Sequence, residues 1–142
     1  MENRKEDILS QCNAMSKNTL METLDITFID FDDNSLTARM PVNSKVHQPD
    51  GVLHGGASVA LAESVGSAGA FLFLNTENIA VRGIEISANH VKSVKDGFVD
   101  AVATIIHKGR TTQLWQIKIL NSNKELVSLV KLTTITIPTQ KT

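Results

Sequence analysis

The chain has 142 residues, a length that predicts one domain with a single core. Hydrophobic residues make up 42% and charged residues 20%, which is typical of a globular protein and excludes intrinsic disorder. The formal net charge of −1 provides no broad basic field for a nucleic acid or an anionic membrane. One cysteine, Cys12, excludes an internal disulfide, and the polar N-terminal residues do not resemble a signal peptide, so we expect a cytoplasmic protein.

The first half of the chain predicts two helices and a hairpin. A short helix is predicted within residues 1–18, where apolar residues recur near helical spacing from residue 5 onward. Strands at 24–31 and 36–42 alternate apolar and polar residues around an Asp-Asp-Asn-Ser turn, which predicts a β-hairpin. After a loop at 43–53, residues 55–74 read as one long helix.

The second half predicts four strands separated by short polar breaks. Because the breaks are short, we expect the strands to be antiparallel neighbours in chain order. A hairpin, a long helix and a run of antiparallel strands predict an α+β fold, with the central helix wrapped by a curved antiparallel sheet in one domain, 1–142. The predicted strands are 79–94, 98–107, 113–121 and 126–137.

The long helix is rich in small residues. Gly66 and Gly69 each cost about 1 kcal/mol relative to alanine inside a helix. Their presence indicates that a sheet or a partner chain approaches the helix closely.

Glu63 is the one charged residue of this helix. No basic residue stands three or four positions away, so the helix offers it no local ion pair. A carboxylate among apolar residues is costly if buried, and it is a candidate for chemistry. The alternative is a structural role, in which Glu63 pairs with a distant arginine or lysine at a chain interface.

The helix opens with His54-Gly55-Gly56, where no Ser, Thr, Asp or Asn stands at the cap position. The first turn of a helix leaves amide groups without partners, and glycines allow another molecule's oxygen to approach them. Such amides can form an oxyanion hole, with the helix dipole behind them. The alternative is that two glycines only ease a tight turn.

Glu63 follows His54 by nine positions, or about 13 Å along a helix. A group that reacts at Glu63 is therefore too far from the Gly55 amide of the same helix. This separation predicts an obligate dimer whose sites combine residues from two chains.

Residues 47–64, which contain the segment from His54-Gly55-Gly56 to Glu63, resemble the hotdog-fold acyl-CoA thioesterases of the 4-hydroxybenzoyl-CoA thioesterase superfamily. Residues 83–93 and 113–117 extend the resemblance. Within the superfamily the chain is most similar to the branch that includes the 1,4-dihydroxy-2-naphthoyl-CoA hydrolases of menaquinone biosynthesis. The resemblance implies a hotdog fold, an aryl-CoA substrate, no cofactor, no metal, and a homodimer that pairs into a homotetramer.

The resemblance also implies roles for single residues. Glu63 would be the nucleophile or the base that activates water, and the Gly55 amide would hold the thioester oxygen. His54 and Gln48 would orient the thioester, and Ser67 would assist near Glu63.

The coenzyme A moiety requires cations. The turn at 108–111 contains a glycine and two cations, a combination that suits phosphate groups, although turn charges in water are the simpler explanation of it. By resemblance this turn and the end of the strand at 79–94 line the coenzyme A path. The candidate residues are Arg82, Asn89, His90, Val91, Lys92, Ser93, Lys108, Gly109, Arg110 and Thr111.

Three alternatives stay open at this point. The first is a thioesterase of broad specificity for phenylacetyl, benzoyl and medium-chain acyl-CoA. The second is a β-hydroxyacyl dehydratase on the same fold, and the third is a non-catalytic hotdog protein that binds acyl-CoA. A binding protein has no need of Glu63, because a buried carboxylate weakens apolar binding. The spacings of the four histidines match no metal-ligand motif.

Overall fold

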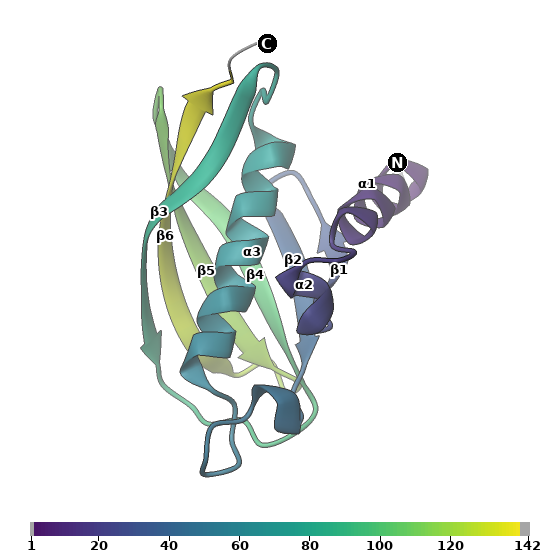
Figure 1. Cartoon of the computed structure of the whole chain (residues 1–142), viewed down its shortest axis with the longest axis vertical. Coiled ribbons are helices and arrows are strands. Elements are labelled where there is room, and N and C mark those ends of the chain that lie inside the picture. Colours follow the sequence, from purple (N-terminus) through teal and green to yellow (C-terminus); the bar gives the residue numbers. More distant parts are fainter. Residues whose placement is uncertain (1, 140–142) are drawn as a thin grey trace.

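The computed structural model describes residues 2–139, which form one six-stranded antiparallel sheet with a long helix along one face (Figure 1). The helices are α1 (Glu2–Met15), α2 (Leu20–Thr23) and α3 (Gly55–Phe73), with a single 3-10 turn at Ser44–Val46. The strands are β1 (Thr27–Phe31), β2 (Ser35–Pro41), β3 (Ile79–His90), β4 (Phe98–Lys108), β5 (Thr112–Asn121) and β6 (Leu126–Pro138). The predicted α+β fold, a central helix wrapped by a curved antiparallel sheet, is confirmed.

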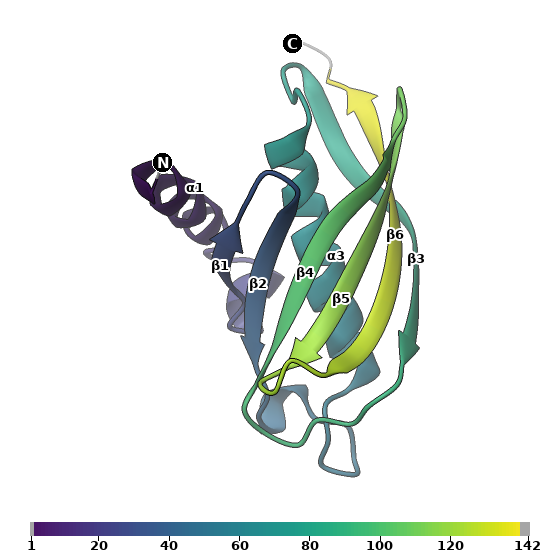
Figure 2. The same ribbon diagram turned by 180° about the vertical axis from the view of Figure 1, so that it is seen from behind.

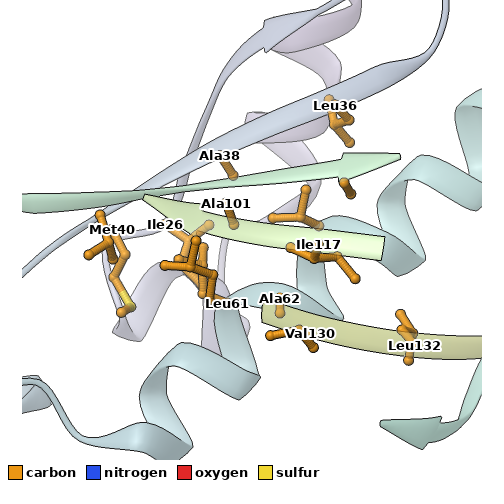
Figure 3. Packing of buried hydrophobic residues seen from close by; sticks show 14 of the residues in the cluster. Ile26, Leu36, Ala38, Met40, Leu61, Ala62, Ala101, Ile117, Val130 and Leu132 are labelled. Carbon is orange, nitrogen blue, oxygen red and sulfur yellow. The ribbon is translucent and has the colours of Figure 1, made fainter. Parts of the chain in front are cut away.

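The long helix α3 is confirmed almost to the residue, since it begins at Gly55 as predicted and ends one residue early. Its buried residues recur every three or four positions and so form one stripe that faces the sheet. Figure 3 shows Leu61 and Ala62 in this stripe beside Ile117, Val130 and Leu132 of the sheet. By length and composition α3 also passes as a membrane span, with a mean hydropathy of 1.3, and its buried residues pack against the sheet.

The two glycines of α3 mark the closest approach of the sheet. A Cβ on Gly66 would lie 2.5 Å from Cδ2 of Leu132, and a Cβ on Gly69 would lie 3.0 Å from the ring of Trp115. The predicted close approach is therefore confirmed, and within this chain the approaching element is the sheet.

The strand order is β1-β2-β4-β5-β6-β3, which Figure 2 shows from the outer face. The prediction that β3 and β4 are neighbours is wrong. β3 pairs with β6 instead, from Ile79 opposite Pro138 to His90 opposite Ser128. The break at 91–97 is a crossover, because the Leu53 amide donates to the Val94 carbonyl at 2.7 Å and draws the chain past the start of α3.

The N-terminal region differs from the prediction in two ways. α1 ends at Met15, and Asn18 adopts a left-handed backbone with φ +62°. A second short helix, α2, follows and is capped by Thr19. The side chain of Asn13 exchanges two hydrogen bonds with the backbone of Phe28, at 2.7 and 3.1 Å. α1 is thereby held at the β1 edge of the sheet (Figure 1).

Candidate active site

Glu63 lies near the middle of α3, with its side chain exposed in this chain. It forms no salt bridge with any of residues 2–139. Its carboxylate reaches the edge strand β3, where a Cβ on Gly83 would lie 3.2 Å from Oε1. The register of β3 shifts between Gly83 and Glu85, which is a β-bulge. The glycine leaves room for a carboxylate that has no basic partner in the described chain.

A cavity of about 570 Å³ lies between α3 and the N-terminal helices, and Glu63 stands in its wall. The rest of its lining is largely apolar. Burial raises the pKa of the Cys12 thiol, which lines the cavity from α1. The cavity therefore offers an apolar surface next to one carboxylate. Its walls include Ile8, Cys12 and Met15 of α1, Met21 of α2, and Ser67, Ala68 and Phe71 of α3.

Two serines follow Glu63 on α3 and differ in their hydrogen bonds. The Ser64 hydroxyl donates to the carbonyl of Ala60 at 2.7 Å, so it is occupied by its own helix. Ser67 lies one turn after Glu63, on the same side of α3, and also lines the cavity. In the described part of the chain its hydroxyl has no hydrogen bond, which leaves it available to a molecule in the cavity.

The start of α3 is capped by a histidine. Nδ1 of His54 accepts a hydrogen bond from the Gly56 amide at 2.8 Å. His54 is therefore the N-cap of α3, although it is not one of the usual capping residues Ser, Thr, Asp and Asn. Because Nδ1 accepts, the neutral ring carries its proton on Nε2. The amides of Ala57 and Ser58 donate to the His54 carbonyl. Within residues 2–139, the Gly55 amide is left without an acceptor.

Both glycines at the helix start lie against imidazole rings. A Cβ on Gly56 would lie 2.8 Å from Cε1 of His54, and a Cβ on Gly55 would lie 2.7 Å from Nε2 of His90. The space that the missing side chains leave is therefore filled within the chain by two histidines. What remains open toward a ligand is the N–H of Gly55.

The loop before α3 is tightly folded. The Gly51 amide donates to the Gln48 carbonyl at 2.9 Å, with Gly51 at φ +78°. The Gln48 side-chain oxygen accepts from the amide of Asp50, which leaves its NH₂ group for other contacts. Nε2 of His47 donates to the Lys95 carbonyl at 2.9 Å and ties the loop to the crossover. The loop thus holds Gln48 and His54 at one end of α3.

Gly55 and Glu63 do not meet within the chain. They are eight residues apart on one unbroken helix, or about 12 Å along its axis. A site that combines residues from two chains stays a prediction.

The coenzyme A candidates fall into two groups at opposite ends of α3 (Figure 1). Residues 89–93 lie near its start, and the turn at 108–111 lies near its end, where Nζ of Lys108 donates to the Phe73 carbonyl at 3.3 Å. The 19-residue helix separates them by about 28 Å. Lys108 therefore has a local role, since a cation stabilises the C-terminus of a helix.

The turn at 108–111 is built by backbone bonds. The Gly109 amide donates to the Thr112 carbonyl at 2.8 Å, and the Thr111 carbonyl accepts from the Thr136 amide at 2.8 Å. Arg110 is exposed and forms no salt bridge within residues 2–139. Of this group, its guanidinium is the cation free for a ligand.

The candidates on and after β3 point in different directions. Asn89 lines a hollow on the outer face of the sheet, whereas His90 turns toward α3. Nζ of Lys92 lies 3.3 Å from Oε2 of Glu125, so its charge has a partner. Val91 and Ser93 are exposed, as is Arg82, whose guanidinium donates to the adjacent Val81 carbonyl.

Sequence reasoning missed three features of this site. Gly83 makes room for Glu63, and its signal was a glycine inside a strand. Ser128 bonds to His90, but only the β3–β6 register brings the two together. The helix α1 was predicted, yet its place over the cavity depends on tertiary contacts.

Comparisons with known proteins identify the family and the fold of the chain. The model of the thioesterase superfamily matches residues 50–128. The 1,4-dihydroxy-2-naphthoyl-CoA hydrolase of Escherichia coli is 43% identical over 131 residues, which are 92% of this chain and 96% of that protein. A relative from Pseudomonas aeruginosa, 45% identical over 95% of this chain and 93% of its own length, is named an esterase, and its crystal structure is described as that of a thioesterase. A thioesterase structure from Haemophilus influenzae superposes with a TM-score of 0.90 at 40% identity, covering 94% of this chain and 92% of that one.

The chain therefore belongs to the thioesterase superfamily, and its architecture is the hotdog fold. It is a thioester hydrolase.

Proposed function

We propose that this thioester hydrolase acts on an aryl-CoA, specifically 1,4-dihydroxy-2-naphthoyl-CoA, with Glu63 as its catalytic carboxylate. The observation that carries the proposal is the position of Glu63, which stands in the wall of an apolar cavity without a basic partner in residues 2–139. A carboxylate at an apolar acyl site is suited to attack a thioester or to activate water.

Two mechanisms use the same residues. As a nucleophile, Glu63 attacks the carbonyl carbon, the C–S bond breaks, coenzyme A leaves as thiolate, and water hydrolyses the resulting anhydride. As a general base, Glu63 takes a proton from water while the water oxygen attacks the same carbon; the C–S bond then breaks and coenzyme A leaves as thiolate. In both, negative charge develops on the carbonyl oxygen, and the free Gly55 amide stabilises it. One such donor lowers the activation barrier by about 2.7–4 kcal/mol.

The site requires a second copy of the chain. Because Gly55 lies about 12 Å from Glu63 along α3, the partner subunit supplies the helix start, together with its His54 ring and its Gln48 amide. Ser67 acts from the same chain as Glu63. The proposed assembly is a homodimer with two such sites, and two dimers form a tetramer.

The same arrangement places the coenzyme A tail. If the two α3 helices lie antiparallel with Gly55 of one beside Glu63 of the other, residues 89–93 of one chain and the 108–111 turn of the other lie about 15 Å apart along the helix axis, on the same side of the site. The two groups that a single chain holds about 28 Å apart then line one path. Arg110 is the cation best placed for phosphate, since Lys92 and Lys108 have partners within the chain, and Arg82 is a further candidate.

The naphthoyl group is favoured by the relatives. Proteins named 1,4-dihydroxy-2-naphthoyl-CoA hydrolase from Escherichia coli and Listeria monocytogenes are 43% and 41% identical to this chain. The cavity of about 570 Å³ falls within the roughly 300–1,000 Å³ of small-molecule sites, which take ligands larger than two fused rings.

A second candidate is a thioesterase of broad acyl specificity. Met15 and Met21 line the cavity, and methionine side chains adapt to ligands of different shape. This feature favours tolerance among aryl and medium-chain acyl groups.

The test measures free thiol released from six thioesters of coenzyme A. Their acyl groups are 1,4-dihydroxy-2-naphthoyl, benzoyl, 4-hydroxybenzoyl, phenylacetyl, hexanoyl and palmitoyl. The proposal predicts the highest kcat/KM for 1,4-dihydroxy-2-naphthoyl-CoA. Similar kcat/KM values across the panel would support broad specificity instead. Thiol release that persists unchanged in Glu63→Ala would rule out the proposed mechanism.

A further inference from the structure

The ring of His90 packs directly on the first residue of α3. A Cβ built on Gly55 would lie 2.7 Å from Nε2 of His90 and 2.9 Å from its Cδ2. Real Cβ atoms do not approach other atoms so closely, so no side chain fits at Gly55 while the ring stays in place. His90 is the last residue of β3 and Gly55 is the first residue of α3, so this contact joins the end of the edge strand to the start of the helix.

Ser128 holds the His90 ring in this position. Its Oγ lies 2.7 Å from Nδ1 of His90, and the two residues stand opposite each other in the β3–β6 register. Ser128 is fully buried, so the bond to His90 satisfies a hydroxyl that would otherwise be costly to bury. Because Nδ1 is engaged by a buried partner, the ring cannot swing away from Gly55 without leaving that hydroxyl unpaired.

Within residues 2–139 the Gly55 amide donates no hydrogen bond. The cap of His54 holds the next amide, that of Gly56, and the described chain offers no acceptor to Gly55. Glycine is also the residue with the greatest backbone freedom. The Gly55 N–H shares a planar peptide unit with the His54 carbonyl, which accepts from the amides of Ala57 and Ser58, so its direction follows that plane. The His90 ring is in contact with Gly55 and limits how far this peptide unit can shift.

From this geometry we infer that His90, held by Ser128, is a positioning residue that fixes the position of the Gly55 N–H. The inference rests on the proposed function, in which that N–H receives the thioester oxygen. An oxyanion donor acts only within a narrow range of distance, roughly 2.7–3.1 Å from the oxygen. A displacement of about 1 Å can cost roughly 100-fold in rate. Greater mobility of the His90 ring would therefore lower kcat and leave KM unchanged.

A direct contact between His90 and coenzyme A is the competing role, and substrate length separates the two. The N-acetylcysteamine thioester of the same acyl group keeps the reacting carbonyl but lacks the nucleotide. Loss of a positioning residue lowers the rate on both thioesters by the same factor. Loss of a coenzyme A contact raises KM for the coenzyme A thioester alone.

The experiment measures kcat and KM for both thioesters in His90→Ala, Ser128→Ala and Ser128→Thr. Ser87→Ala, on the outer face of the same strand, is the control. We expect kcat to fall about tenfold or more in His90→Ala, and by less in Ser128→Ala, on both thioesters. Ser128→Thr keeps the hydroxyl and should restore most of the rate. If His90→Ala does not fold, Ser128→Ala supplies the same test, because it leaves the ring in the chain.

A double-mutant cycle tests the contact itself. Gly55→Ala should lower kcat about tenfold in the wild-type background, because its Cβ displaces the His90 ring. In the His90→Ala background the ring is gone, so the same change should cost under about threefold. Equal losses in the two backgrounds would show that the residues act independently and would overturn the inference.

Two further results would overturn it: unchanged kcat in both His90→Ala and Ser128→Ala, or a rise in KM confined to the coenzyme A thioester. Failure of the proposed function gives a different pattern, since wild-type protein would then release no thiol, or Glu63→Ala would retain full activity. The variants at 90 and 128 are compared only against an active wild type that depends on Glu63.

Discussion

The carboxylate of Glu63 rests against Gly83, where a Cβ would lie 3.2 Å from Oε1. The contact joins the middle of α3 to a β-bulge in the edge strand β3. A glycine inside a strand has no side chain to pack and marks a bulge or a close approach. Its role is the room that it leaves for the acidic side chain.

Gly83→Val should therefore impair activity more than stability. The new side chain pushes the Glu63 carboxylate from its position, and kcat should fall by about tenfold or more. The new side chain also approaches Cδ1 of the buried Leu132, 3.4 Å from the Cβ position, so the melting temperature should fall by a few degrees while the fold persists. Ser87→Val, on the same strand but away from Glu63, is the control. Full activity in Gly83→Val would show that the contact has no functional role.

Gly66→Ala should destabilise the fold without touching the site. Its Cβ would lie 2.5 Å from Cδ2 of the fully buried Leu132, and overpacking of this kind costs about 1–3 kcal/mol. The cost is measured by chemical unfolding. Leu132→Ala alone opens a cavity, at about 2–5 kcal/mol. In the double variant the alanine at position 66 fills part of that cavity. The double variant should therefore lose less unfolding free energy than the two single variants lose together. Strict additivity would contradict the packing.

Cys12, the one cysteine of the chain, reports on the cavity. Burial raises the pKa of its thiol, so the reactive thiolate is scarcer at neutral pH than in an ordinary cysteine. Alkylation by iodoacetamide should be slow at pH 7, and its rate should keep rising with pH above about 8.5. Saturating aryl-CoA, bound to the inactive Glu63→Gln variant, should slow it further. Labelling that is indifferent to the thioester would place the acyl group elsewhere.

Sequence reasoning succeeded where local pattern and spacing decide the structure. The helix predicted at 55–74 is α3, and the glycines at 66 and 69 mark the approach of the sheet. The distance between Gly55 and Glu63 followed from the helix rise alone. These features depend on periodicity and on residue size, both of which a single sequence contains.

Sequence reasoning failed where partners distant in the chain decide. The short break before β4 suggested a hairpin, but the bond from Leu53 to Val94 makes that segment a crossover, and β3 pairs with β6. The ring of His90 meets Gly55 for the same reason, since Ser128 lies opposite it only in this register. No local pattern contains a contact between residues so far apart in sequence.

The proposed sharing of each site between two chains predicts complementation between inactive chains. Glu63→Gln removes the carboxylate, and Gly55→Pro removes the donor N–H at the first helical position, where its ring also displaces His90. Each variant alone should be inactive. A mixed dimer, purified through two different tags, contains one intact site and should show about half of the wild-type rate. A mixed dimer without activity would place both residues of a site in the same chain.

The most direct test compares thiol release from 1,4-dihydroxy-2-naphthoyl-CoA by wild type, Glu63→Gln and Glu77→Gln. Both changes neutralise an exposed glutamate at nearly constant shape, but Glu77 lies beyond the end of α3 and is not among the residues that line the cavity. The proposed mechanism predicts a loss of at least about 1,000-fold in kcat for Glu63→Gln and wild-type rates for Glu77→Gln. Thiol release by Glu63→Gln at the wild-type rate would contradict the central role of this carboxylate.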